Sequence, residues 1–316
     1  DMALAYYHTT YMGYIIILNF NEEHIAKIRK AISLLYYNIR DMSEIYGDFR
    51  LHIGCSNIRY SCGELPAALR EAHTAEWGRL IFLGSSILEY HQVEKLKRFH
   101  PTAVISPAEQ NNFKECIRYL RREELSTLFE EFHKRAGGLN NAYPFDISNT
   151  FFILRDLILD CLKNEDDKQR MKKDCYYSYL EARNFQQLLK NLFLLIEKYM
   201  EEEEKKIKEK MGRPISEAIL YIKKNYMYQI SLEEAAAAGN ISPTYLSKLF
   251  KEEMQQGFNE FLTQIRLEES QRLLAESNLT IKEIAAMVGY PDEKYFSRLF
   301  KKVTSIKPTD YRRLYG

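Results

Sequence analysis

The heptapeptide Tyr245-Leu-Ser-Lys-Leu-Phe-Lys251 is repeated 50 residues later as Tyr295-Phe-Ser-Arg-Leu-Phe-Lys301. Each copy follows a short apolar segment, at 232–238 and at 281–287, and a turn that contains glycine. Apolar residues recur at helical spacing on both sides of each turn, so each copy predicts two short helices joined by a tight turn. The repeat therefore indicates two helix-turn-helix units within the last hundred residues of the chain.

The second helix of each unit has a recognisable start and a face that we expect to be buried. Ser242 and Asp292 are favourable N-cap residues, and Pro243 suits the first helical position. Apolar residues recur at i, i+3 and i+4, which places them on one side of a helix. The residues on this side are Leu246, Leu249, Phe250, Phe296, Leu299 and Phe300.

The opposite face of each second helix carries side chains that can donate hydrogen bonds to base edges and phosphates. In the first unit these are Thr244, Tyr245, Ser247, Lys248 and Lys251. In the second unit they are Lys294, Tyr295, Ser297, Arg298, Lys301 and Lys302. We expect all of them to contact double-stranded DNA, with Lys248 and Arg298 at base edges and Lys251, Lys301 and Lys302 at phosphates. A pair of helical hairpins with solvated charges is the simpler alternative, and the matching second copy argues against it.

The stretch Phe258–Leu274 between the two units is similar to the linker helix of the AraC/XylS family of transcription regulators. Further segments resemble the C-terminal signature of that family: Ile284-Ala285, Val288-Gly289-Tyr290, Tyr295-Phe296, Phe300-Lys301 and Lys307–Arg312. The resemblance covers residues 213–316 and implies a DNA-binding domain, a role as an activator and RNA polymerase as a partner. Gln255 and Ser305 depart from it, because the family usually has glycine at these two positions.

The predicted linker helix is long enough to hold two reading helices about one turn of DNA apart. From Gly257 to Ala275 it has roughly 19 residues, which span about 28 Å at about 1.5 Å per residue. One turn of DNA measures about 34 Å, so DNA is expected to bend toward the protein if the spacing falls short. Because both units lie on one chain, we expect the domain from about Arg213 to bind an operator of roughly two helical turns as a monomer.

The composition restricts the class of protein. A chain of 316 residues predicts two or three domains, and 46% hydrophobic residues are enough for well-packed cores. The net charge is only +1, and residues 213–316 carry 15 Lys and Arg against 13 Asp and Glu, so DNA binding must depend on locally placed cations. The five cysteines form no C-x-x-C pair and the seven histidines are scattered, which predicts no disulfide framework, metal site or cofactor. With no long apolar run and no signal peptide, we expect a cytoplasmic bacterial protein without membrane contact.

Residues 1–96 predict a partial α/β module, with strands at 11–20, 49–56 and 80–83 and helices at 22–45 and 65–77. Ile53–Ser56 and Leu65–Ala72 resemble the C-terminal half of a degenerate GGDEF-type, nucleotide-cyclase-like domain. The string Tyr46-Gly-Asp-Phe49 lacks the second acid of the hairpin that holds metal and phosphates in such enzymes, so we expect no catalytic residue and no enzymatic activity. The resemblance implies that the first strands of the module, and a receiver domain or a membrane sensor, lie upstream of Asp1.

Residues 97–212 predict a helical connector, with helices at 108–120, 123–135, 147–162 and 176–210. The last of these carries apolar residues in alternating steps of four and three, namely Phe185, Leu189, Leu192, Ile196 and Tyr199. Such a stripe is typical of a core-facing helix, and also of a coiled-coil seam. The second interpretation predicts a homodimer through this helix.

The sequence therefore predicts a mainly α protein with three parts: an α/β module at 1–96, a helical connector at 97–212 and a double helix-turn-helix domain at 213–316. The leading hypothesis is a sequence-specific transcription regulator that serves as the output part of a two-component response regulator. A one-component regulator that senses a ligand is the alternative among binding proteins. A nucleotide-cyclase-type enzyme is the distant alternative from another class.

Overall fold

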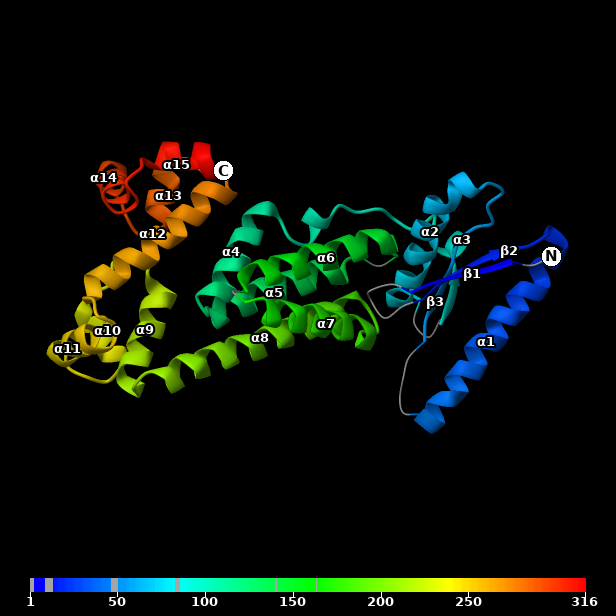
Figure 1. The fold of residues 1–316 in the computed structure, drawn as a ribbon, viewed down its shortest axis with the longest axis horizontal. Helices are drawn as coiled ribbons and strands as arrows, with labels where there is room; N and C mark the ends of the chain where they lie inside the picture. The colour runs from blue at the N-terminus through cyan, green and yellow to red at the C-terminus, as the bar shows by residue number, and fades with distance from the viewer. Residues whose placement is uncertain (1–2, 9–13, 47–50, 83–85, 140, 163) are drawn as a thin grey trace. The chain divides into compact units, whose positions relative to one another are not determined.

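The computed structural model describes residues 3–8, 14–46, 51–82, 86–139, 141–162 and 164–316. Contacts divide the chain into two compact units. Unit 1 comprises Asp1–Ile117 and Arg122–Glu197, and unit 2 comprises Arg118–Arg121 and Lys198–Gly316. Each unit is predominantly helical, as the sequence predicted (Figure 1).

Unit 1 begins with two small, separate sheets. Strands β1 (Ala3–His8) and β2 (Tyr14–Asn19) pair antiparallel, whereas β3 (Ile53–Cys55) and β4 (Ile87–Glu89) pair parallel. Helices α1 (Ile25–Tyr46) and α2 (Leu65–Trp77) occupy the positions that the sequence predicted for them. Because the strands do not form one continuous sheet, the fold does not confirm a cyclase-like module. Part of the string Tyr46–Phe49 lies outside the described residues.

The strand predicted at 80–83 is wrong in the part that the structure describes. Residues Gly78–Leu80 form a 3-10 helix, and the chain enters strand β4 only at Ile87. Arg79 in this 3-10 helix is 6% exposed and donates from Nη1 to the carbonyl of Ala182, at 2.7 Å. This contact holds the backbone where the helix predicted at 176–210 is interrupted.

The remaining helices of unit 1 form its core. They are α3 (Tyr90–Val93), α4 (Pro107–Arg118), α5 (Arg122–Gly137), α6 (Pro144–Cys161), α7 (Glu165–Glu181) and α8 (Phe185–Lys210), which continues into unit 2. The single helix predicted at 176–210 is thus two helices. Asn184 stands just before α8, where its side-chain oxygen accepts a hydrogen bond from the backbone N–H of Gln187.

The apolar stripe on α8 is buried within the single chain. Relative exposures are 6% for Phe185, 1% for Leu189, 0% for Leu192 and Ile196, and 9% for Tyr199. A side chain that is already covered has little further area to lose on association, so it gains little from a dimer interface. The burial supports the core-facing interpretation of this stripe and argues against its use as a dimer seam.

Unit 2 contains the two helix-turn-helix units. Its helices are α9 (Arg213–Asn225), α10 (Leu232–Ala238), α11 (Pro243–Glu253), α12 (Phe258–Glu276), α13 (Ile281–Met287), α14 (Glu293–Thr304) and α15 (Pro308–Tyr315). The linker helix α12 has the predicted length of 19 residues and runs from α10–α11 at one end to α13–α14 at the other (Figure 1). Two separate hydrophobic cores form around its two halves.

Gly54 in β3 is expected to tolerate no side chain. A Cβ atom there would lie 2.5 Å from the backbone nitrogen of Glu76 and even closer to the carbonyl of Ala72, both in α2. Gly54→Ala should therefore destabilise unit 1 by about 1–3 kcal/mol, because backbone atoms cannot move aside cheaply. Gly63→Ala is the matched control, since its Cβ would meet only Ser61 Oγ, at 3.6 Å. Thermal unfolding followed by circular dichroism compares the two; equal melting temperatures would contradict the expectation.

Ser305 is expected to be a site where glycine stabilises unit 2. It follows α14 with φ of +68°, and Gln255 follows α11 with φ of +54°, so both keep the left-handed turn that glycine favours. Ser305→Gly should stabilise the fold by about 0.5–1 kcal/mol, since glycine lacks the steric penalty of a Cβ atom in this conformation. Ser305→Ala retains the Cβ atom and should bring no gain. The difference between the two variants in urea unfolding measures the effect, and a less stable glycine variant would refute it.

Candidate DNA-binding site

Helix α11 presents the first predicted reading face to solvent. Ser242 caps it as predicted, because its hydroxyl accepts a hydrogen bond from the backbone N–H of Tyr245 at 3.2 Å. Leu246 and Phe250 are fully buried on the inner side. On the outer side Thr244, Tyr245, Lys248 and Lys251 are exposed and Ser247 is half-buried. The five residues predicted to bind DNA therefore share one accessible face.

Helix α14 repeats this arrangement. Asp292 accepts hydrogen bonds from the backbone N–H groups of Lys294 and Tyr295, at 2.8 and 3.1 Å, and confirms the predicted N-cap. These bonds, that of Tyr295 first, hold the pKa of Asp292 below its ordinary value. Phe296 and Phe300 are fully buried. The outer face consists of exposed Lys294, Tyr295, Arg298, Lys301 and Lys302 with half-buried Ser297.

The two faces offer the same kinds of group at the same places. Lys248 and Arg298 each stand six residues after their N-cap, and Lys251 and Lys301 stand nine residues after it. Lys248 Nζ lies 3.7 Å from Glu252 Oε1, and both side chains are more than half exposed, so this surface pair is weak and can yield to a phosphate. Each face thus combines hydroxyl and cationic donors that suit the major groove.

Sequence reasoning missed the caps of the first helix in each unit. Ser231 and Glu234 form a reciprocal capping box at α10, and Thr280 and Glu283 form another at α13. The Thr280 backbone N–H and hydroxyl hold the pKa of Glu283 below its ordinary value. The signal was present in the sequence, since Ser or Thr followed three residues later by Glu is the usual pattern of a capping box.

Sequence reasoning also missed Arg266, which lies in the middle of α12 and is only 6% exposed. Its Nε donates to the carbonyl of Tyr226 at 2.8 Å, and its Nη2 donates to the carbonyl of Tyr228 at 2.7 Å. The guanidinium also lies over the ring of Tyr290, 5.0 Å from the centroid. Arg266 therefore touches elements of both helix-turn-helix units.

Unit 2 also includes the short segment Arg118–Arg121. The ring of Tyr119 lies 4.5 Å from that of Tyr226, and its hydroxyl donates to Glu269 Oε2 on α12 at 2.8 Å. Glu269 is 2% exposed and also accepts from Arg272 Nε at 2.9 Å. Burial first, and then the Glu269 carboxylate, raise the pKa of Tyr119 well above its ordinary value, so the hydroxyl remains a donor at neutral pH. The segment is thus part of the packing of α12.

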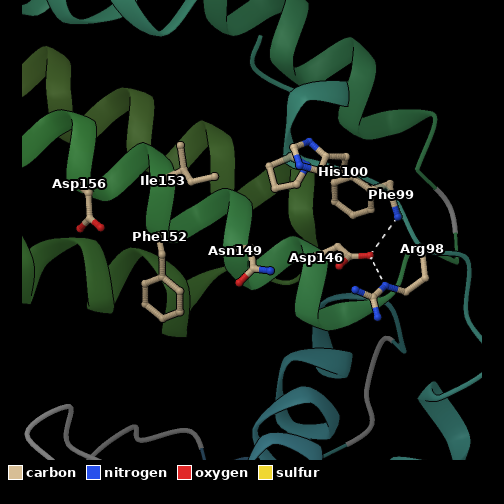
Figure 2. Close-up of a pocket in the computed structure, with 9 residues that line it drawn as sticks. Arg98, Phe99, His100, Asp146, Asn149, Phe152, Ile153 and Asp156 are labelled. Carbon is tan, nitrogen blue, oxygen red and sulfur yellow. Dashed lines mark hydrogen bonds and ion pairs between the residues drawn. The ribbon is translucent and has the colours of Figure 1, made fainter. Parts of the chain in front are cut away.

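Unit 1 contains an open pocket of about 650 Å³ beside α6 (Figure 2). At one end of the pocket the Asp146 carboxylate accepts from Arg98 Nε and from the backbone N–H of Phe99, both at 2.9 Å. Asn149 and Asp156 line it further along the same helix. Because Asp146 and Arg98 satisfy one another, we assign no ligand to this pocket.

The described residues can also be compared with the requirements of a metal site and of a membrane-spanning helix. Within the described ranges, no group of three or more His, Cys, Asp or Glu side chains is arranged to hold a metal ion. Among the described residues, none of the helices combines the length and the apolar composition that a membrane-spanning segment needs.

Comparison with known proteins finds similarity over the same region. A family model described as a helix-turn-helix domain matches residues 235–314. The uncharacterized HTH-type transcriptional regulator YijO of Escherichia coli is 44% identical over 95 residues, which are 30% of this chain and 34% of that protein. The lactose operon transcription activator of Staphylococcus xylosus is 34% identical over 102 residues, 32% of this chain and 37% of that protein. The chain therefore spans only about a third of the length of these relatives.

A solved structure is similar over the same share of the chain. The C-terminal domain of AraT, a response regulator from Geobacillus stearothermophilus, is 39% identical, with a TM-score of 0.32. The match covers 33% of this chain and 87% of that one. The family model does not reach residues 1–212, so it gives no support to a cyclase-like module upstream. The two helix-turn-helix units at the C-terminal end of this chain are an AraC-type DNA-binding domain.

Proposed function

We propose that this protein is a sequence-specific DNA-binding transcription regulator that reads two successive major-groove turns with α11 and α14. The observation that carries the proposal is the repeated face: two capped helices on one chain present matching cations and hydroxyls at equal distances from their N-caps. The linker helix α12 extends about 28 Å at about 1.5 Å per residue, near one turn of DNA. The relatives described above are named as transcription regulators, which supports a regulator rather than an enzyme.

We further propose that the protein acts in the cytoplasm as an activator, with RNA polymerase as a partner, and as the output part of a response regulator. One relative is named as an activator and a structural relative as a response regulator, which supports these finer assignments. The upstream GGDEF-like module remains our proposal on sequence pattern alone, with the predicted helix α2 in its favour and the two separate sheets against it.

The direct test is selection of bound duplexes from a random DNA library by the purified full chain. The selected sequences should contain two different short motifs centred about one helical turn apart, because the two reading faces are similar but not identical. Light scattering of the complex should give one chain per duplex. A selection that enriches no sequence, or a single motif bound by two chains, would contradict the proposal.

Arg298 and Lys248 are expected to read base edges, most favourably guanine. Arg298→Ala should weaken binding to the selected duplex by about 1–3 kcal/mol, or roughly 5- to 150-fold, and Lys248→Ala should act in the same way. Binding to a scrambled duplex should change much less, because a base-edge contact has no fixed partner there. Fluorescence anisotropy with both duplexes measures the difference. Equal losses on the two duplexes would make these residues phosphate contacts only.

Lys251, Lys301 and Lys302 are expected to contact phosphates, since they lie one turn further along their helices. Replacing any one of them with Ala should reduce the slope of log K against log salt by about 0.9, the counterion release of one phosphate contact. The matched control is Lys172→Ala, which removes an equal charge from an exposed position in unit 1. The measurement is affinity across a salt series. If a site variant and the control give the same slope, the assignment is wrong.

A further inference from the structure

The linker helix α12 belongs to two hydrophobic cores that meet at Arg266. On its N-terminal side Phe258, Phe261, Leu262 and Ile265 pack into the first core. On its C-terminal side Leu267, Leu273 and Leu274 pack into the second. Each core fixes the helices on its own half of α12. The angle between the halves then depends on the stiffness of one helix and on interactions across the junction.

Arg266 makes the main interactions at this junction. It donates to the carbonyls of Tyr226 and Tyr228. These carbonyls lie at and just beyond the C-terminal end of α9, which packs with the first helix-turn-helix unit. A cation there satisfies carbonyls that the helix leaves unpaired and opposes the negative end of the helix dipole. The same guanidinium lies over the ring of Tyr290 in the second helix-turn-helix unit, which is a favourable cation–π contact.

The loop after α9 also meets the turn of the second unit directly. Gln229 Nε2 donates to the carbonyl of Gly289 at 2.9 Å. Gly289 has φ of +86°, and a Cβ atom on it would lie 2.9 Å from both Met227 O and Arg266 Cζ. The two backbones therefore approach so closely that only glycine fits between them. This contact leaves little freedom for one helix-turn-helix unit to rotate against the other.

We propose that Arg266 is a positioning residue that locks α11 and α14 at one distance and angle, and thereby makes the protein selective for the spacing of its two DNA motifs. Arg266 itself is buried and has no route to DNA. Each inserted base pair shifts the second motif by about 3.4 Å and about a tenth of a turn, which a rigid pair of helices cannot follow. This inference rests on the proposed function above, and it concerns spacing rather than base identity.

The test is a spacing series with the full chain. Duplexes carry the two selected motifs with the intervening length changed by −1, 0, +1 and +2 base pairs, and anisotropy gives each affinity. The wild-type protein should lose at least about tenfold at −1 and at +1. Arg266→Met keeps an unbranched side chain that matches the apolar stem of arginine, but removes the guanidinium with its donors and charge. It should bind the best duplex more weakly and lose less than about threefold at −1 or +1.

The matched control is Glu268→Ala, an exposed position on the same helix, which should retain the steep wild-type profile. Because Arg266→Met removes a buried group, thermal melting must show that it folds. Gln229→Ala provides a second variant, since Gln229 is exposed and its loss removes only the bond to Gly289. Gln229→Ala should reduce the loss of affinity at −1 and +1, but by less than Arg266→Met does.

The outcomes separate the two proposals. A folded Arg266→Met with the wild-type spacing profile would overturn the positioning role and leave the proposed function intact. If Arg266→Met does not fold, a wild-type spacing profile for Gln229→Ala would equally overturn the positioning role. Failure of the wild-type chain to select any paired motif would instead refute the proposed function.

Discussion

The structure of unit 2 depends on the buried guanidinium of Arg266, whose partners include two backbone carbonyls and an aromatic ring. Burying a cation costs free energy unless hydrogen bonds replace its water. Arg266 recovers that cost at the end of α9, where helix geometry leaves carbonyls unpaired, and against the face of Tyr290. These partners belong to different helix-turn-helix units, so the same interaction that makes the burial tolerable also defines how the units are arranged. The positions of α11 and α14 follow from this constraint.

Because the DNA-binding domain has a weak net charge, its electrostatic attraction to DNA depends largely on the exposed cations of α11 and α14. With 15 basic and 13 acidic residues in 213–316, the domain has little long-range attraction for the DNA backbone. A protein of this kind forms few strong complexes with arbitrary sequence, because non-specific binding is mostly electrostatic. Discrimination then depends on how well two reading faces fit two groove segments at once. A rigid arrangement increases that discrimination, since a poor fit in one groove cannot be relieved by movement of the other unit.

The sequence predicted what local chemistry determines. The caps Ser242 and Asp292, the buried Phe250 and Phe300 and the length of α12 all follow from residue types within a few positions of one another. What the sequence left open, or predicted wrongly, depends on distant partners. The stripe from Phe185 to Tyr199 has the same spacing in a core and in a seam, and only its neighbours decide between them. Where the sequence predicted a strand from residue 80, Gly78–Leu80 is a 3-10 helix, and Arg79 within it donates to the carbonyl of Ala182, about a hundred residues away in sequence. Arg266 could not be recognised because α12 is buried on several sides and shows no clear polar face.

The segment Arg118–Arg121 means that the DNA-binding unit is not one continuous stretch of sequence. A gene fragment that starts at Arg213 encodes both helix-turn-helix units, yet it omits Tyr119, whose ring covers Tyr226 and whose hydroxyl reaches the buried Glu269. In such a fragment, water must replace a tyrosine in front of an apolar ring and a carboxylate. Recombination that moves this unit into another protein as a cassette therefore leaves behind one of its own packing residues. The new host must supply an equivalent aromatic donor or accept a less stable linker helix.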